Sequence, residues 1–216
     1  MECNFSLKHY EECLALAKQK GYQFLTFNEY DEKEKYDKVI FMRHDVDLQV
    51  DVALKIAKIE SKLGIKSTFF IRLHGTYNVQ HTATYRKFLE IKNMGHEIGL
   101  HFEPDFSTIN KRVMIKDIKF SIKTLEHLFS CKINSICPHE PVRTGNMEVD
   151  DKMLKELGVK YHAYHDMFLK DMKYISDSSC RWREGCMHLF IEKGTPKLCI
   201  LTHPLWWFEN SPIENY

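Results

Sequence analysis

Hydrophobic and polar positions follow two alternating periods along most of the chain. Short apolar runs typical of buried strands occur at 39–42, 67–73, 97–102, 133–137, 159–163, 172–176 and 197–202. Segments with apolar residues at helical spacing lie at 6–20, 50–63, 83–94, 113–129 and near 148–157, and several end at a glycine. Repeated strand–helix–strand units predict a parallel sheet, either closed into a barrel or doubly wound.

Length and composition indicate one soluble globular domain. The 216 residues are 44% hydrophobic and 28% charged, so we expect a single domain over 1–216, with 1–38 as a leading helix and loop. A net charge of +1 provides no broad positive field, which excludes nucleic acid as the principal partner. No apolar run approaches the roughly 18 residues of a membrane span. No secretory signal is visible, so we expect a cytoplasmic protein with its seven cysteines reduced.

Polar side chains gather where the predicted strands end. The first strand runs into Asp45 and Asp47, and the third into His101, Glu103 and Asp105; His139 and His203 follow two later strands. A single histidine or aspartate at a strand end is usually structural or caps a helix. Because the carboxyl ends of parallel strands meet at one face, four such ends together predict a functional site.

The residue types in this group favour a metal. Asp45 and Asp47 are two residues apart, so in an extended segment they share one face and can serve a metal and a water together. Histidine and carboxylate ligands suit zinc, and also iron, cobalt or manganese. Such an ion lowers the pKa of a bound water and polarises a carbonyl group.

Several sequence motifs strengthen this interpretation. They are RHDVD (43–47), GIKSTFFIR (64–72) and GHEIGLHFE (95–103), with looser matches at CPHEP (137–141), SDSSCRW (176–182) and ILTHPLWW (200–207). In order and spacing they resemble the motifs of the polysaccharide deacetylases, carbohydrate esterase family four, and in particular an intracellular subgroup with RHDVD and HPxWW. The resemblance covers about 39–207 and implies an α/β fold, a distorted (β/α) barrel of about seven parallel strands.

The resemblance also assigns roles to individual residues. It implies that Asp47 and His101 bind the metal and that Asp45 is the general base, although Val46 separates two aspartates that are adjacent in the family. The family's second metal histidine is replaced by Asp105 here. Asp105, His139 and Glu103 therefore compete for the third ligand position.

Further roles concern the later motifs. His139 stands where the family has an arginine that holds the catalytic aspartate, so it is either an orienting cation or a replacement ligand. His203 matches the general acid, and Asp177 matches the residue that orients it. Trp182, Trp206 and Glu103 are candidate substrate contacts, with core packing an equal alternative for the tryptophans.

Together these features predict a metal-dependent hydrolase, with zinc as the expected ion, that removes an N-acyl group, such as acetyl, from a sugar, a nucleotide sugar or a polysaccharide precursor. One alternative is a catalytically degenerate saccharide-binding protein on the same fold. Another is hydrolysis of a different non-peptide C–N bond. The sequence does not indicate an oligomeric state.

Overall fold

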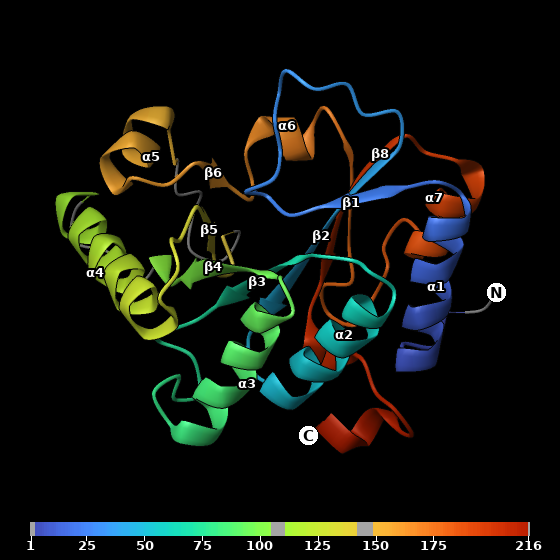
Figure 1. The fold of residues 1–216 in the computed structure, drawn as a ribbon, viewed down its shortest axis with the longest axis horizontal. Helices are drawn as coiled ribbons and strands as arrows, with labels where there is room; N and C mark the ends of the chain where they lie inside the picture. Colours follow the sequence, from blue (N-terminus) through green and yellow to red (C-terminus); the bar gives the residue numbers. More distant parts are fainter. Residues whose placement is uncertain (1–2, 105–110, 142–148, 216) are drawn as a thin grey trace.

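A curled parallel sheet forms the centre of the computed structural model, which describes residues 3–104, 111–141 and 149–215 (Figure 1). The strands are β1 (Gln23–Leu25), β2 (Val39–Val46), β3 (Thr68–Ile71), β4 (Glu97–Phe102), β5 (Ser135–Pro138), β6 (Tyr161–His162), β7 (Lys173–Ser176) and β8 (Lys197–Thr202). Seven of them follow the order β6-β5-β4-β3-β2-β8-β7, β1 pairs with β2, and all pairings are parallel. No ladder joins β6 to β7 within the described residues, so the predicted barrel is confirmed as a half-barrel.

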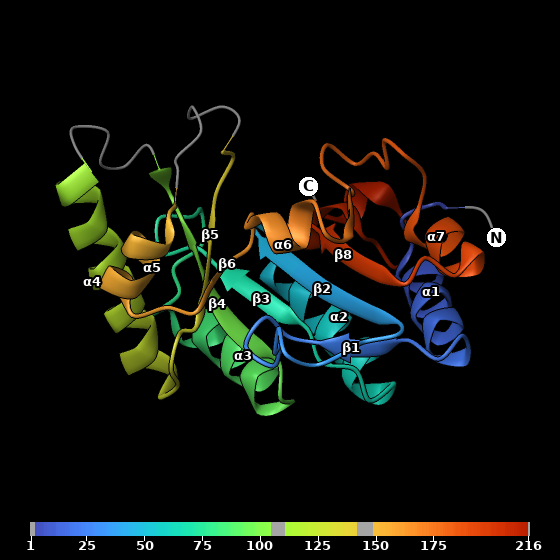
Figure 2. The ribbon, with the colours of Figure 1, turned by 90° about the horizontal axis from the view of Figure 1, so that it is seen from above.

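Helices connect the strands and cover the sheet. They are α1 (Leu7–Gln19), α2 (Val50–Lys62), α3 (Thr82–Asn93), α4 (Lys111–Phe129), α5 (Asp151–Leu157), α6 (Asp166–Leu169) and α7 (Met187–Lys193), followed by 3-10 turns at Pro204–Trp206 and Pro212–Asn215. Figures 1 and 2 show α2 and α3 along one face of the sheet, with α4 and α1 at its two ends. The first four helices lie within two residues of the ranges that the hydrophobic pattern predicts. Among the described residues, no helix combines the length and the hydropathy needed to cross a membrane.

Three short elements were not predicted from the sequence. They are β1, inside the segment assigned to a leading helix and loop, and the helices α6 and α7. Elements of three to seven residues contain too few positions to display a period. β1 depends on tertiary pairing, because it occupies the first half of one edge of β2 while β3 occupies the second half.

The central strand β2 is buried on both faces, and this determines where its polar side chains point. Alternate residues enter two separate hydrophobic clusters: Ile40, Met42 and Val46 beneath the helices, Val39 and Phe41 inside the half-barrel. Because side chains alternate with a period of two, Arg43 and Asp45 continue the inner face and His44 the outer one. The inner face of β2 therefore delivers Asp45 to the carboxyl end of the half-barrel.

On the outer face, His44 meets a buried carboxylate of α2. Glu60 is fully buried, lies 3.0 Å from His44 Nε2, and accepts hydrogen bonds from the hydroxyls of Tyr10 (2.7 Å) and Ser67 (2.6 Å). Burial raises the pKa of Glu60, but His44 and these hydrogen bonds lower it by more, so the net pKa lies below its usual value. An ionised carboxylate thus joins α1, α2 and the sheet.

This carboxylate predicts an acid-sensitive fold. The contribution of a group whose pKa is depressed by folding is complete above its unfolded pKa, here 4.5, and is lost as the pH falls through the lower folded value. We therefore expect the Glu60→Gln variant to lose roughly 2 kcal/mol of unfolding free energy at pH 7 and to show a flatter decline below pH 4.5.

Urea unfolding of both proteins across this pH range provides the measurement. Glu90→Gln is a matched control, because Glu90 is 48% exposed on α3 and its ion pair with Lys58 lies on the surface. Equal stability and equal acid dependence of the wild type and the Glu60→Gln variant would contradict this role of Glu60.

Candidate active site

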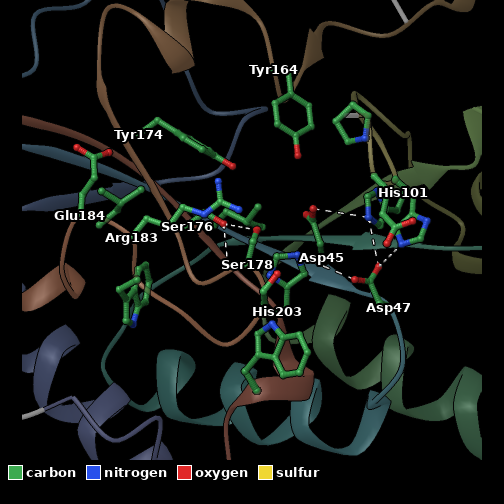
Figure 3. Close-up of a pocket in the computed structure, with 18 of the residues that line it drawn as sticks. Asp45, Asp47, His101, Tyr164, Tyr174, Ser176, Ser178, Arg183, Glu184 and His203 are labelled. Carbon is green, nitrogen blue, oxygen red and sulfur yellow. Dashed lines mark hydrogen bonds and ion pairs between the residues drawn. The ribbon is translucent and has the colours of Figure 1, made fainter. Parts of the chain in front are cut away.

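The carboxyl ends of β2, β4, β5 and β8 surround one cavity of about 670 Å³. Asp45, Asp47, His101, His139 and His203 all line it. Figure 3 shows Asp45, Asp47 and His101 side by side, with His203 close to them. The structure therefore brings together the strand-end residues that the sequence predicts to meet at one face.

Three of these side chains form a compact group of possible metal ligands. One donor atom from each of Asp47, His101 and His139 lies within 4.8 Å of the others. The Asp47 Oδ1 atom is 3.4 Å from His101 Nε2 and 3.6 Å from His139 Nε2. Metal bonds of about 2.0–2.1 Å place neighbouring tetrahedral donors about 3.3 Å apart, so these separations suit a zinc-like ion.

Hydrogen bonds orient both histidines toward that point. His101 donates its Nδ1–H to the Cys137 carbonyl (2.9 Å), and His139 Nδ1 lies 3.0 Å from Glu103 Oε2. Each ring thereby directs Nε2 at Asp47, the arrangement in which metal-binding histidines are normally held. The Glu103 carboxylate also forms an ion pair with Arg72.

These contacts bear on the three candidates for the third ligand position. His139 faces Asp47 and His101 directly, whereas Glu103, also a candidate substrate contact, lies against His139 and Arg72 and does not line the cavity. Asp105 lies outside the described residues. Among the described candidates, the geometry favours His139 as the ligand and Glu103 as the residue that positions it.

Unpaired polar atoms and charge support a cation at this point. Within the described part of the chain, the buried atoms Asp47 Oδ1 and Asp45 Oδ1 have no hydrogen-bond partner, although the Arg72 guanidinium forms an ion pair with Asp47 Oδ1 at 3.6 Å. Burial lowers the pKa of His101, but Asp45, Cys137 and Asp47 raise it by more, so Nε2 favours a positive charge, either a proton or a metal ion. The donor set therefore fits a divalent metal.

A second group of possible metal ligands also contains His101, but it is less accessible from the cavity. Asp45, His101 and Cys137 also have donor atoms within 4.8 Å of one another. However, the Arg43 guanidinium donates to Asp45 Oδ2 (2.8 Å) and to the Cys137 sulfur (3.2 Å), and Cys137 does not line the cavity. A positive charge thus already occupies the side of Asp45 that faces Cys137.

Arg43 is the side chain that holds Asp45 in this structure. Its side chain is fully buried and donates to Asp45 from the same strand, two residues away. Burial raises the pKa of Asp45, but Arg43, His101 and His203 together lower it by more, to about 2. Asp45 therefore remains ionised near neutral pH, with Oδ2 held and Oδ1 without a partner in the described ranges of the chain.

His203 is held by a buried carboxylate, as its sequence motif predicts. Its Nδ1 lies 2.6 Å from Asp177 Oδ1, and its backbone N–H also donates to Asp177. The Trp207 indole donates to the other oxygen of Asp177 (2.9 Å). Burial lowers the pKa of His203, but Asp177 raises it by more, so the net shift is upward. The protonated form is thereby favoured, with Nε2 4.0 Å from Asp47 Oδ2.

Aromatic side chains form part of the cavity wall. Trp182 and Trp206 line it and also pack against the hydrophobic core, so both alternatives considered for them stay open. Their buried indole nitrogens have no hydrogen-bond partner among the described residues. Tyr164 and Tyr174 line it as well and point their hydroxyls toward the space near Asp45 (Figure 3). No sequence motif indicates the two tyrosines, because they lie between the motifs, in and beside the strands β6 and β7.

No protein-family model matches the sequence, and no curated protein matches it either. Solved structures do resemble it. A family 4 carbohydrate esterase from Bacillus anthracis superposes with a TM-score of 0.51 and 17% identity, over 94% of this chain and 81% of that one. A peptidoglycan N-acetylglucosamine deacetylase gives 0.52 and 16%, over 94% and 84%. The chain has the fold of the family 4 carbohydrate esterases.

The same fold includes proteins without activity. A pseudoenzyme of this family from Bacillus anthracis has a TM-score of 0.52 at 16% identity, over 78% of this chain and 55% of that one. A mutant of this pseudoenzyme with restored enzymatic activity gives 0.53 at 16% identity, again over 78% of this chain. This chain spans 57% of the mutant's length. The fold alone therefore does not separate hydrolysis from binding, and the arrangement of the site residues must decide.

The contact between Glu103 and His139 generates a testable prediction. If Glu103 holds His139 as a ligand, Glu103→Gln should weaken zinc affinity by about 10–100-fold without unfolding the protein. Competition with a fluorescent chelator measures the affinity, and circular dichroism checks the fold. Glu90→Gln is the control, since Glu90 lies on the surface of α3. Unchanged affinity in Glu103→Gln would argue against His139 as a ligand.

Proposed function

We propose that this protein is a metal-dependent hydrolase that removes an N-acyl group, such as acetyl, from an amino sugar. The observation that carries the proposal is the placement of the Asp47, His101 and His139 donors in one cavity with Asp45 and His203. The shared fold with sugar deacetylases supports the choice of a carbohydrate substrate.

Asp47, His101 and His139 would hold the metal, and zinc is the expected ion because one carboxylate and two imidazoles suit it. When bound, such an ion lowers the pKa of a water and polarises the acyl carbonyl. Three protein ligands leave further coordination positions open toward the cavity, as hydrolysis requires. Proton transfer would be carried out by side chains of the protein.

Asp45 is the proposed base. Arg43 holds one of its oxygens, while the other, Oδ1, is buried and has no partner in the described part of the chain. That oxygen can accept a proton from the attacking water. Arg43 keeps the carboxylate ionised and fixes its orientation, so the acceptor is in place before the substrate arrives.

His203 is the proposed acid. Asp177 holds Nδ1, so Nε2 points into the cavity and carries the proton that the departing amine needs. Asp177 is in turn fixed by the Trp207 indole and the His203 backbone N–H. The base and the acid thus come from different elements, β2 and the end of β8.

The shape of the cavity suits a saccharide. Trp182 and Trp206 provide apolar faces for a sugar ring, and the Tyr164 and Tyr174 hydroxyls provide polar contacts. Arg183, exposed at the cavity, supplies a positive charge for a phosphorylated or nucleotide-linked sugar. A cytoplasmic location, which would suit such a substrate, stays a prediction from the sequence.

Acetate release from a panel of N-acetylated monosaccharides, nucleotide sugars and oligosaccharides tests the proposal. We expect turnover by the zinc-reconstituted protein and none by Asp47→Ala. Sugar binding without turnover at full metal occupancy would instead support the catalytically degenerate binding protein. Turnover of cyclic amides alone would support hydrolysis of another C–N bond.

A second prediction separates the acid from the metal ligands. Because His203 does not belong to the ligand group, His203→Ala should retain metal and lower kcat by about 10²–10⁴-fold. Steady-state kinetics with parallel metal analysis measures both properties. His127→Ala is the control, since His127 is exposed on α4. Undiminished kcat in His203→Ala would remove His203 from the mechanism.

A further inference from the structure

A second cluster of possible metal ligands lies outside the cavity, between the helices α1 and α7. It consists of His9 and Cys13 on α1 with Cys186 and His188 at the start of α7. One donor atom from each residue lies within 4.8 Å of all the others. The two helices pack side by side at one edge of the molecule (Figures 1 and 2).

Local structure presents these four side chains to one point. His9 and Cys13 are four residues apart on a helix, so they share one face of α1. Cys186 is the N-cap residue of α7, and His188 lies in the first turn of that helix. Packing of α1 against α7 completes the group of two thiols and two imidazoles.

Distances within the cluster match a tetrahedral site. The Nε2 atom of His9 is 3.3 Å from the Cys186 sulfur and 3.4 Å from the Cys13 sulfur. Zinc bonds of about 2.3 Å to sulfur and about 2.0–2.1 Å to nitrogen place adjacent tetrahedral donors about 3.5 Å apart. The His188 ring stands edge-on to His9, with centroids 5.3 Å apart.

The polar atoms of the cluster contact one another and the neighbouring Cys3 thiol, but within the described residues not every one of them has a partner. All four residues are buried, with exposures of 4% or less. Within the described residues, His188 Nδ1 is buried and has no hydrogen-bond partner. His9 Nδ1 is unpartnered as well, but the nitrogen of His9 that faces the two sulfurs is Nε2. The structural histidine His96 differs, because its two ring nitrogens contact Ser67 and the Ala57 carbonyl. A buried polar group without a partner is costly, and a bound ion would offset part of that cost.

We propose that His9, Cys13, Cys186 and His188 bind one Zn²⁺ ion in a structural site. Two thiols and two imidazoles complete a tetrahedral shell with no open position, which distinguishes this site from the three-ligand group in the cavity. Each bound zinc ion displaces the protons of the two thiols, so two protons are released. The ion would fasten the N-terminal helix to α7.

This fastening has a structural consequence for the cavity. α1 carries Tyr10, which hydrogen-bonds Glu60, and Phe5 just before α1 contacts the rings of Trp182 and Trp207. Trp182 lines the cavity, and the Trp207 indole holds Asp177. A zinc ion at the cluster would therefore stabilise the packing behind one wall of the cavity.

The experiment uses Asp47→Ala protein, so that the cavity site does not contribute metal. After reconstitution with zinc under reducing conditions, we expect about one zinc ion per chain by elemental analysis. Cobalt substitution should produce a thiolate-to-cobalt charge-transfer band, because the proposed site contains two cysteines. Cys13→Ser and Cys186→Ser, each added to Asp47→Ala, should abolish the band, lose the zinc, and lower the melting temperature by about 10 °C.

Cys137→Ser in the same background is the matched control, because Cys137 is the buried thiol beside the cavity group, and it should retain zinc and the band. Absence of zinc and of the band in reconstituted Asp47→Ala would overturn the proposal, as would a Cys13–Cys186 disulfide under these conditions. The measurement on Asp47→Ala stands even if the serine variants do not fold. Its outcome does not depend on whether the protein hydrolyses a sugar.

Discussion

Double-sided burial of β2 is the constraint on which the rest of the structure depends. The strand pairs with β1 and β3 along one edge and with β8 along the other, so it cannot shift in register without disrupting three ladders. A one-residue shift would exchange its faces, moving Asp45 under the helices and His44 into the half-barrel. The position of the proposed base is therefore set by the hydrophobic residues Val39 and Phe41, which precede it on the same face.

A buried carboxylate lies on each face of this strand, and the two negative charges are compensated differently. On the inner face, Arg43 neutralises Asp45 through a 2.8 Å contact and leaves one oxygen of the carboxylate for chemistry. On the outer face, Glu60 uses its oxygens for hydroxyl and imidazole contacts to three elements and has none left for a ligand. The comparison shows why one buried carboxylate suits a reactive site and the other a structural one.

Support by hydrogen bonds distinguishes the candidate site from a chance collection of polar residues. His101, His139 and His203 each have one ring nitrogen engaged, by the Cys137 carbonyl, Glu103 and Asp177 respectively. Each ring therefore presents its other nitrogen in a defined direction. Such support is expected where precise placement matters more than stability. In the cluster of His9, Cys13, Cys186 and His188, the Nδ1 atoms of both histidines have no partner within the described residues, and a four-ligand structural ion would itself provide the orientation.

The sequence by itself determined the parallel α/β class, the four long helices and the strand ends at which the polar residues meet. Those features follow from local periodicity and from the rule that parallel strands end at one face, and neither needs contact information. The adjacency of Asp45, Asp47, His101 and His203 was predictable for the same reason.

Only the tertiary structure decided the remaining features, because they depend on residues far apart in the chain. Hydrogen-bond direction, which no motif encodes, favours His139 over Glu103 as the third ligand. Arg43 holds Asp45 because both face inward from β2. β1 exists through its pairing with β2, and the His9–Cys13 and Cys186–His188 pairs come together only because α1 packs on α7. Neither pair can be recognised as a metal site from its spacing in the sequence. Each pair supplies only two ligands, and a closed tetrahedral shell needs four.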